Sequence, residues 1–113
     1  MASVIRASMT FGTKPEKNMR NYRLSKKAEI DLLDIAIHGD REFGIAQSDK
    51  YRDKLKKQFS IIGSSPLHYS SVDHIRVGYR RSVCGVHSIY YKIGNDGVSE
   101  IVRILRGQST DDI

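Results

Sequence analysis

The sequence has a single cysteine and no long apolar run, and each scarcity excludes a class of protein. Cys84 has no second thiol in the chain with which to form a disulfide, so a disulfide-stapled scaffold is excluded. No segment has the apolar length of a signal peptide or a membrane-spanning helix, and we therefore expect a cytoplasmic protein without membrane contacts. With 113 residues, the chain has room for one compact core and none for a second catalytic domain.

Potential metal ligands are also sparse. His38, His68 and His74 form no recognised ligand spacing with one another or with Cys84, whereas structural and catalytic zinc sites have characteristic spacings. We therefore expect no metal and no cofactor.

Basic residues outnumber acidic ones. Nineteen lysines and arginines stand against thirteen aspartates and glutamates, which gives a net charge of +6 at pH 7. Such a charge favours an anionic partner, either a nucleic acid or an acidic protein. A basic surface that serves only solubility is the alternative, because ordinary soluble domains carry charges of this size.

The first half of the chain predicts a short strand followed by two helices. Residues 21–24 alternate polar and apolar side chains, and Ser25 then occupies the position of a helix N-cap. Two apolar stripes at helical spacing follow, separated by Gly44, and the second ends at residues 63–66. The stripes consist of Ala28, Leu32, Ile35, Gly39 and Phe43, and of Ser48, Tyr51, Leu55, Phe59 and Ile62.

The second half predicts three consecutive antiparallel strands over residues 75–83, 86–93 and 98–106. An Asp-Gly step within residues 94–97 suits a tight hairpin between the last two. The final strand is almost continuously apolar from Ile101 to Leu105, which places it in the interior of the sheet. In the first strand, the expected inward side chains are Ile75, Val77, Tyr79 and Val83, and the expected outward ones are Arg76, Arg80 and Ser82.

The element order βααβββ predicts an α+β fold in which a helical hairpin packs on a small, mainly antiparallel sheet. Residues 1–18 show neither helical nor strand periodicity and are expected to form a flexible N-terminal extension, which leaves residues 19–113 as a single domain. Met19 is an alternative natural start. A targeting role for the extension is a further alternative, because Arg6 precedes the first acidic residue.

Several arginines lie on or beside the expected strands. Arg80, Arg81, Arg103 and Arg106 could bring guanidinium groups together at one face or edge of the sheet. Such a cluster attracts phosphate or carboxylate groups. Surface salt bridges are the alternative role for each of these residues.

Three segments of the expected strands are distinctive, namely GYRR at residues 78–81, GVHSIYY at 85–91 and VRIL at 102–105. Together they resemble the RelE/ParE toxin superfamily, and among its members the ParE-type plasmid-stabilisation toxins. The resemblance covers nearly all of residues 19–108. It implies a RelE/ParE-like fold and the toxin component of a type II toxin-antitoxin system. In this family the position of His87 is expected to be structural rather than that of a catalytic base.

The resemblance leaves three functions open. ParE-like members resemble inhibitors of DNA gyrase, and RelE-like members resemble ribosome-dependent mRNA endoribonucleases. The tail after Leu105 lacks the Tyr or His that such a ribonuclease is expected to use, so a gyrase inhibitor without catalytic residues is favoured over an enzyme. It also has Arg106 and Gly107 where ParE toxins often have a histidine, which is compatible with a weak or inactive toxin. A non-toxic, basic nucleic-acid-binding module ranks third.

The expected partners are a ParD-like antitoxin and DNA gyrase, with operator DNA contacted only through the antitoxin complex. The candidate target-binding residues are Arg80, Arg81, Arg103, Arg106 and Gln108. The candidate antitoxin-binding residues are Ile30, Leu33 and Ile37, on the first helix. Ordinary core packing is the alternative role for each of them, because Leu33, Ala36 and Ile37 widen the apolar stripe that is expected to be buried.

Overall fold

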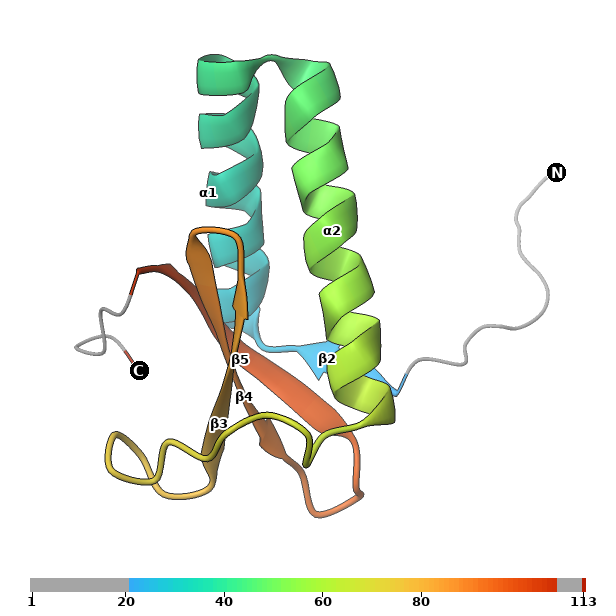
Figure 1. Ribbon diagram of the computed structural model, residues 1–113, viewed down its shortest axis with the longest axis vertical. Helices are drawn as coiled ribbons and strands as arrows, with labels where there is room; N and C mark the ends of the chain where they lie inside the picture. Colours follow the sequence, from blue (N-terminus) through green and yellow to red (C-terminus); the bar gives the residue numbers. More distant parts are fainter. Residues whose placement is uncertain (1–20, 108–112) are drawn as a thin grey trace, which may run out of the picture.

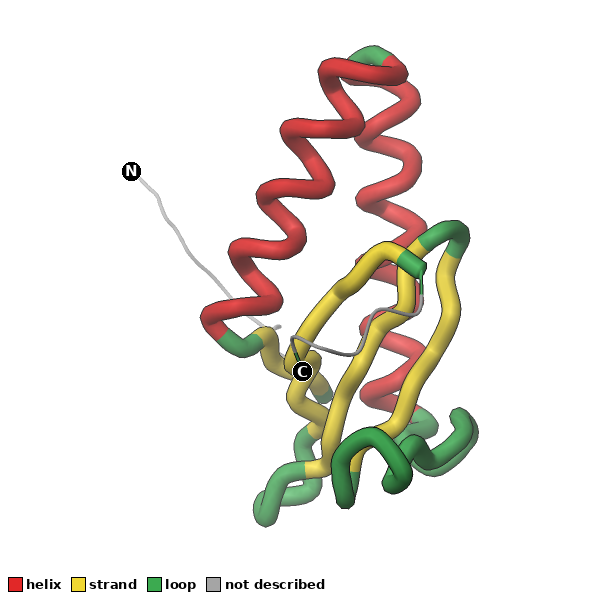
Figure 2. Tube along the Cα trace, turned by 90° about the vertical axis from the view of Figure 1, so that its left-hand side faces the viewer, coloured by secondary structure: helices red, strands yellow, loops and turns green. Residues whose placement is uncertain are grey.

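The structure is a computed structural model that describes residues 21–107 and residue 113. A helical hairpin packs against one face of a four-stranded sheet (Figure 1; Figure 2). The predicted α+β class and the order βααβββ are confirmed. The expected extension over residues 1–18 lies outside the described residues. The elements are β2 (Tyr22–Leu24), α1 (Lys26–Phe43), α2 (Ile45–Ser64), β3 (Tyr79–Cys84), β4 (His87–Ile93) and β5 (Ser99–Arg106).

The sheet has the strand order β2-β5-β4-β3. Strands β3, β4 and β5 form the predicted antiparallel meander, and β2 adds to β5 in parallel. The interior position predicted for the last strand is confirmed. Because β2 pairs only with residues 99–101 of β5, residues 102–106 have no neighbouring strand on that side within the described part of the chain.

The core lies between the hairpin and the inner face of the sheet. The second predicted stripe is confirmed, since Leu55, Phe59 and Ile62 are fully buried. The Phe59 ring also packs against Tyr22 of β2, with ring centroids 5.6 Å apart. The sheet residues in this core are Cys84, Ile89, Tyr91, Ile101 and Ile104.

Ser25 joins the start of α1 to the sheet. Its hydroxyl oxygen accepts a hydrogen bond from the Ala28 amide at 3.0 Å, which confirms the predicted N-cap. The same hydroxyl donates to the Val102 carbonyl at 2.8 Å, and the Ser25 amide donates to the Ile101 carbonyl at 2.9 Å. The first turn of the helix is therefore fixed to β5.

Asp31 holds α1 to the part of β5 that β2 leaves unpaired. Its carboxylate accepts the Ile104 amide at 3.0 Å and two guanidinium hydrogen bonds from Arg103, at 2.8 and 3.0 Å. The side chains of Asp31 and Arg103 are only 12% and 15% exposed. A helix carboxylate thus satisfies a strand-edge amide that would otherwise be desolvated without a partner.

The predicted strand over residues 75–83 is wrong in its first half and in its inward face. Residues 75–78 form a turn in which the Asp73 carboxylate accepts the Gly78 amide, and β3 begins at Tyr79. Ser82 and Cys84 face the helices and are buried, whereas Val83 is 62% exposed. The reason is packing against α2, because Gln58 donates a hydrogen bond to Ser82 and so sets which side of β3 faces inward.

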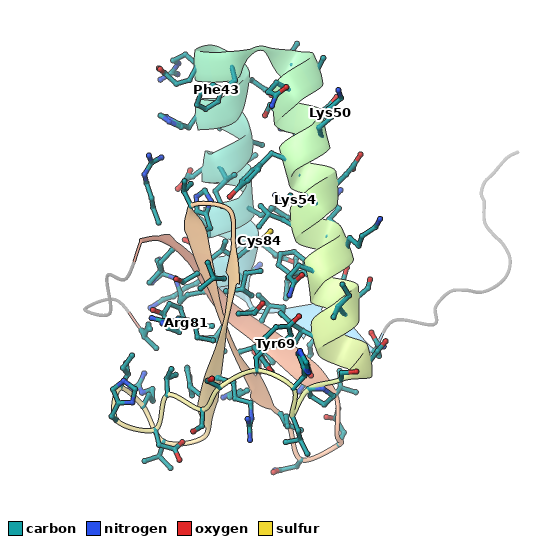
Figure 3. All side chains as sticks on the ribbon, viewed as in Figure 1. Phe43, Lys50, Lys54, Tyr69, Arg81 and Cys84 are labelled. Atoms are coloured by element: carbon teal, nitrogen blue, oxygen red, sulfur yellow. The ribbon has the colours of Figure 1, made fainter. Side chains whose placement is uncertain are left out.

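The tip of the hairpin also departs from the prediction. Phe43, expected in the buried stripe, is 67% exposed, as is Ile45. Both flank Gly44, the only residue between the helices, and the tip stands clear of the sheet (Figure 1; Figure 3). Gly44 has φ 86° and ψ 157°, a conformation that is costly for residues with a side chain.

We predict that Asp31→Ala lowers the free energy of unfolding by about 3 kcal/mol, because it leaves both the Arg103 guanidinium and the Ile104 amide without their acceptor. Urea denaturation followed by circular dichroism measures this. Asp34→Ala is the matched control, since Asp34 is an exposed carboxylate on the same helix, and it should change stability by less than about 0.5 kcal/mol. Equal losses in the two variants would contradict the role given to Asp31.

Candidate functional site

The outer face of α1 carries an exposed apolar stripe. Ile30, Leu33 and Ile37 are 53%, 59% and 48% exposed, and their spacing places them together on the side opposite the core-facing Ala28. The helix is therefore apolar on two opposite sides. Exposed aliphatic side chains grouped in this way mark surfaces that bind partners.

The sheet separates the arginines that the sequence suggested would converge. Arg81 and Arg103 lie in one cross-strand row on either side of the buried Tyr90, about 10 Å apart by the spacing of strands. Arg80 points to the other face, where its guanidinium donates to the Tyr69 carbonyl at 2.7 Å. Arg106 stands at the end of β5, opposite His87.

The candidate arginines also differ in whether their guanidinium groups are bound by other parts of the protein. The Arg103 guanidinium is held by Asp31, and Arg80 is held by a loop carbonyl. Arg106 is exposed and Arg81 half-buried, with Arg81 beside the strands in Figure 3. Gln108 lies outside the described residues.

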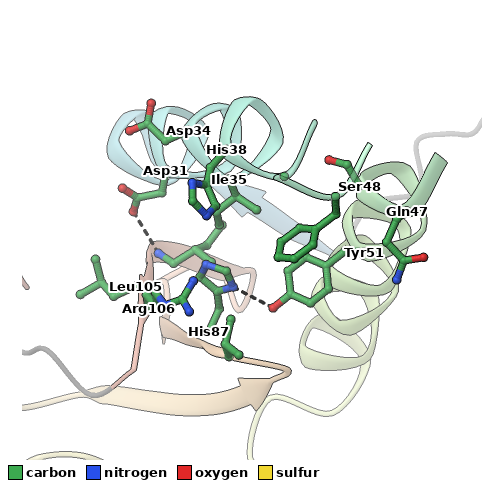
Figure 4. A pocket seen from close by; sticks show the side chains of 14 residues that line it. Asp31, Asp34, Ile35, His38, Gln47, Ser48, Tyr51, His87, Leu105 and Arg106 are labelled. Carbon is green, nitrogen blue, oxygen red and sulfur yellow. Dashed lines mark hydrogen bonds between the residues drawn. The ribbon is translucent and has the colours of Figure 1, made fainter. Parts of the chain in front are cut away.

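A cavity of about 540 Å³ opens between the upper part of the hairpin and the ends of β4 and β5. Its walls are mainly apolar, with Ile35 and Phe43 from α1, Val86 from the turn between β3 and β4, and Ile104 and Leu105 from β5. Its polar groups come from both helices and from strands β4 and β5 (Figure 4). They are Asp31, Asp34 and His38 on α1, Gln47, Ser48 and Tyr51 on α2, His87 on β4 and Arg106 on β5.

A hydrogen-bonded pair forms the polar wall of this cavity (Figure 4). The Tyr51 hydroxyl lies 3.0 Å from the Cys84 carbonyl and 2.7 Å from Nδ1 of His87. A hydroxyl has one proton to donate, and the Cys84 carbonyl can only accept a hydrogen bond, so the Tyr51 hydroxyl donates to that carbonyl. The contact with His87 is then satisfied if Nδ1–H of His87 donates to the Tyr51 oxygen. This assigns the neutral ring to the tautomer in which Nε2 is an acceptor.

Gly85 permits this contact. A Cβ atom at Gly85 would lie 2.7 Å from the Tyr51 hydroxyl oxygen, and the residue has φ 60°, in the left-handed region that favours glycine. The turn between β3 and β4 therefore lets the phenol reach the strand ends. The sequence predicted Tyr51 as a core residue and His87 as a structural histidine, but it did not predict that the two are partners.

Burial controls protonation at this site. Burial lowers the pKa of His87, and the nearby Arg106 lowers it further. Burial also raises the pKa of the Tyr51 phenol. At neutral pH the histidine is therefore neutral and the tyrosine is a hydrogen-bond donor.

Other chemistry finds little support in the described part of the chain. No group of three or more His, Cys, Asp or Glu residues there could hold a metal ion. Cys84 is buried, and burial raises the pKa of its thiol, which disfavours the nucleophilic thiolate. No helix among these residues is both long and apolar enough to cross a membrane.

A family model described as the ParE toxin of the type II toxin-antitoxin system parDE matches residues 22–110. The chain belongs to the ParE toxin family. The resemblance seen in the strand segments is thereby confirmed, and the match spans every helix and strand described above.

Curated relatives and a solved structure agree with this assignment. Toxin ParE1 of Caulobacter vibrioides is 33% identical over 87 residues, covering 77% of this chain and 88% of the relative. Toxin ParE1 of Mycobacterium tuberculosis is 29% identical over 84 residues, covering 74% and 86%. A chain of the chromosomal ParDE toxin-antitoxin system from P. aeruginosa superposes with a TM-score of 0.69 at 18% identity, covering 81% of this chain and all of that one. This last likeness concerns the fold.

We predict that this ParE-family protein loses stability as the pH falls from 8 to 5. Because burial lowers the pKa of folded His87 below its ordinary 6.5, the unfolded chain binds the extra proton first. Stability is therefore lost from about pH 6.5 down to the folded pKa. Thermal unfolding midpoints across this range measure the slope. His87→Asn should flatten it and His74→Asn should not; an unchanged slope in His87→Asn would refute the assignment.

Proposed function

We propose that this ParE-family toxin inhibits DNA gyrase in the cytoplasm by binding the enzyme, and that a ParD-like antitoxin neutralises it. Family membership supports the toxin role. The observation that carries binding over catalysis is the chemistry around His87. Its Nδ1 is committed to Tyr51 and the adjoining cavity is mainly apolar, whereas cleavage of RNA needs an acid and a base beside a phosphate held by cations.

The proposed gyrase-binding surface uses Arg80, Arg81 and Arg106. Arg106 is exposed and Arg81 half-buried at strand positions held by the sheet, so they present positive charge without reorganisation. Arg80 supplies charge beside the loop that contains Tyr69. Arg103 supports the surface through the ion pair with Asp31 that fixes β5. Charge at such a rim speeds association and aligns partners.

We predict that purified, antitoxin-free protein inhibits supercoiling of relaxed plasmid by gyrase with ATP and accumulates linear DNA from trapped cleavage. The triple variant Arg80→Ala, Arg81→Ala, Arg106→Ala should fold and lose at least about tenfold in inhibition, since a charged contact of this kind contributes up to about 1 kcal/mol and three are removed together. The matched control is Lys50→Ala with Lys54→Ala, which removes charge from the outer face of α2 (Figure 3) and should leave inhibition unchanged.

Full inhibition by the folded triple variant would show that the proposed surface is wrong. No inhibition by the folded wild-type protein would reject gyrase as the target. A ribosome-dependent mRNA cleavage assay would then test the alternative activity.

The antitoxin is proposed to bind through a flexible segment that is acidic and apolar, and that folds as it crosses the hairpin and sheet. The exposed stripe of Ile30, Leu33 and Ile37 supplies the apolar contact, and the net charge of +6 favours an acidic partner. Operator DNA would be bound by the antitoxin within the complex.

We predict that Leu33→Glu weakens antitoxin binding by at least about tenfold, because it places an unpaired charge in an apolar contact. Leu33 is 59% exposed in the free protein, so folding should be preserved. Isothermal titration with the purified antitoxin measures the affinity. Leu67→Glu changes an aliphatic side chain that is 69% exposed elsewhere and should bind like the wild type. Equal affinities for Leu33→Glu and the wild type would exclude the outer face of α1 from the interface.

A further inference from the structure

The face of the sheet that points away from the helices carries arginines on either side of a tyrosine. Ser82 of β3 is buried on the face that packs against the helices, so the neighbouring Arg81 points to the opposite, outer face. Tyr90 is the cross-strand partner of Arg81, and Arg103 is the cross-strand partner of Tyr90, so the three side chains share this face. Both helices and the core lie on the other side of the sheet (Figure 2).

Tyr90 is fully buried although both helices pack on the opposite face of the sheet. It does not belong to the core cluster between the hairpin and the sheet. Its hydroxyl is buried as well and has no hydrogen-bond partner within residues 21–107 and 113. Because buried hydroxyls are nearly always hydrogen-bonded, this group requires an acceptor from outside the described residues.

The two residues that bound the segment 108–112 both lie against this sheet. The Gly107 carbonyl accepts a hydrogen bond from the Ser88 hydroxyl at 2.8 Å, which fixes Gly107 at one end of the strands. At the other end, the Ile113 carbonyl accepts a hydrogen bond from the Arg76 guanidinium at 2.9 Å. Arg76 in turn lies over the Tyr79 ring, 5.8 Å from its centroid. The C-terminus is thus on the side of the strands away from α2, as Arg81 is (Figure 1; Figure 3).

The separation of these two ends restricts the path between them. Residues 79–84 of β3 span about 17 Å at the ordinary rise of a strand, and residues 108–113 reach at most about 20 Å when extended. A chain that joins Gly107 to Ile113 therefore has little slack for a path around the molecule. The segment contains two adjacent carboxylates, Asp111 and Asp112, in a chain whose net charge is +6.

We propose that the outer face of the sheet is a carboxylate-binding surface and that its occupant in the free protein is the chain's own C-terminal segment, residues 108–113. In this arrangement, the carboxylates of Asp111 and Asp112 accept hydrogen bonds from the Arg81 guanidinium and from the Tyr90 hydroxyl, while Ile113 stays on Arg76. The inference goes beyond the proposed function and does not rest on it, because it concerns a contact within one molecule.

The contact makes access to Arg81 conditional on the position of the C-terminal segment. A segment tethered at Gly107 competes at an effective concentration in the millimolar range, so an external anion has to displace it. Salt weakens the contact, because exposed charges are screened. Arg81 also belongs to the proposed gyrase-binding surface, and binding through that residue would require the segment to leave.

NMR spectroscopy of the full chain tests whether the C-terminal segment lies over Arg81. The double variant Asp111→Asn, Asp112→Asn removes the charges and keeps the side-chain size, so it should shift the Nε–Hε signal of Arg81 and increase the mobility of the segment in relaxation measurements. The matched control is Glu42→Gln with Asp53→Asn, which removes two exposed carboxylates from the helices and should change neither signal. A wild-type segment as mobile as that of the charge-free variant, or equal Arg81 shifts in both double variants, would overturn the proposal.

Variants of the sheet test the same contact from the other side. Tyr90→Phe keeps the ring and removes only the hydroxyl, so the segment should become more mobile; a hydroxyl without a partner would leave it unchanged. Arg81→Gln should also release the segment, and adding it to the charge-free segment should have no further effect, because both changes break one contact. Lys50→Gln on α2 is the matched control for loss of a cation and should leave the segment in place.

An unchanged segment in either Tyr90→Phe or Arg81→Gln, or additive effects of the sheet and segment changes, would contradict the proposed contact. If a sheet variant does not fold, the segment variants still decide the question, since they leave the sheet intact.

Inorganic phosphate is the probe for displacement of the segment, at an ionic strength held constant with sodium chloride. Half-saturation of the Arg81 Nε–Hε shift should require about fivefold more phosphate in the wild type than in Asp111→Asn, Asp112→Asn, because the segment has to leave first. Equal half-saturation would show that the segment does not occupy the face. Signals of the segment that depend on protein concentration would place it on a second copy of the chain, and this result would also overturn the proposal.

Discussion

The ion pair between Asp31 and Arg103 fixes the relation between the helical hairpin and the sheet. The strand β2 is too short to pair with the whole of β5. Beyond the paired residues, the Asp31 carboxylate accepts the hydrogen bond of the Ile104 amide. A helix side chain thus replaces part of a missing strand. Asp31 also lines the cavity beside the ends of β4 and β5, so the contact that fixes α1 to β5 borders the same cavity as the polar wall around His87.

The ion pair with Asp31 also separates Arg103 from the other arginines that the sequence suggested would form one surface. Arg81 and Arg103 occupy one row across Tyr90, but Arg103 is drawn into the ion pair and Arg81 is not. Arg106 is an exposed residue that lines the cavity and also belongs to the proposed gyrase-binding surface. An antitoxin segment that crosses the hairpin and sheet at this end would cover that arginine directly. Neutralisation could then proceed by simple exclusion, without a change in the toxin's conformation.

Much of the fold could be predicted from the sequence because periodicity and capping act locally. The N-cap at Ser25 and the buried stripe of Leu55, Phe59 and Ile62 could be predicted from the residues next to them in the sequence. The face of β3 that turns inward could not be found in this way, because Gln58 of α2 determines it across 24 residues of sequence.

The candidate site was harder to predict than the fold, because its groups meet only in three dimensions. Tyr51 and His87 are 36 residues apart, and no spacing rule connects them. The left-handed Gly85 beside the strand carrying His87 was the available signal, since a glycine at a strand end can mark a close approach by another side chain. Ile30, Leu33 and Ile37 could be named as candidates from the sequence, but the same pattern also allowed Leu33 and Ile37 to widen the buried face of the helix. Their exposure excludes that assignment.

The one-residue connection at Gly44 has a consequence for how two copies of this chain could interact. Its backbone conformation belongs almost exclusively to glycine, so a side chain there would favour a straightened junction in which α1 and α2 continue as one long helix. In that form, α1 of one molecule could pack on the sheet of another and recreate every native contact except the turn. Domain swapping is a hazard when a short hinge is strained, and Gly44 is the position between α1 and α2 where a side chain would introduce such strain.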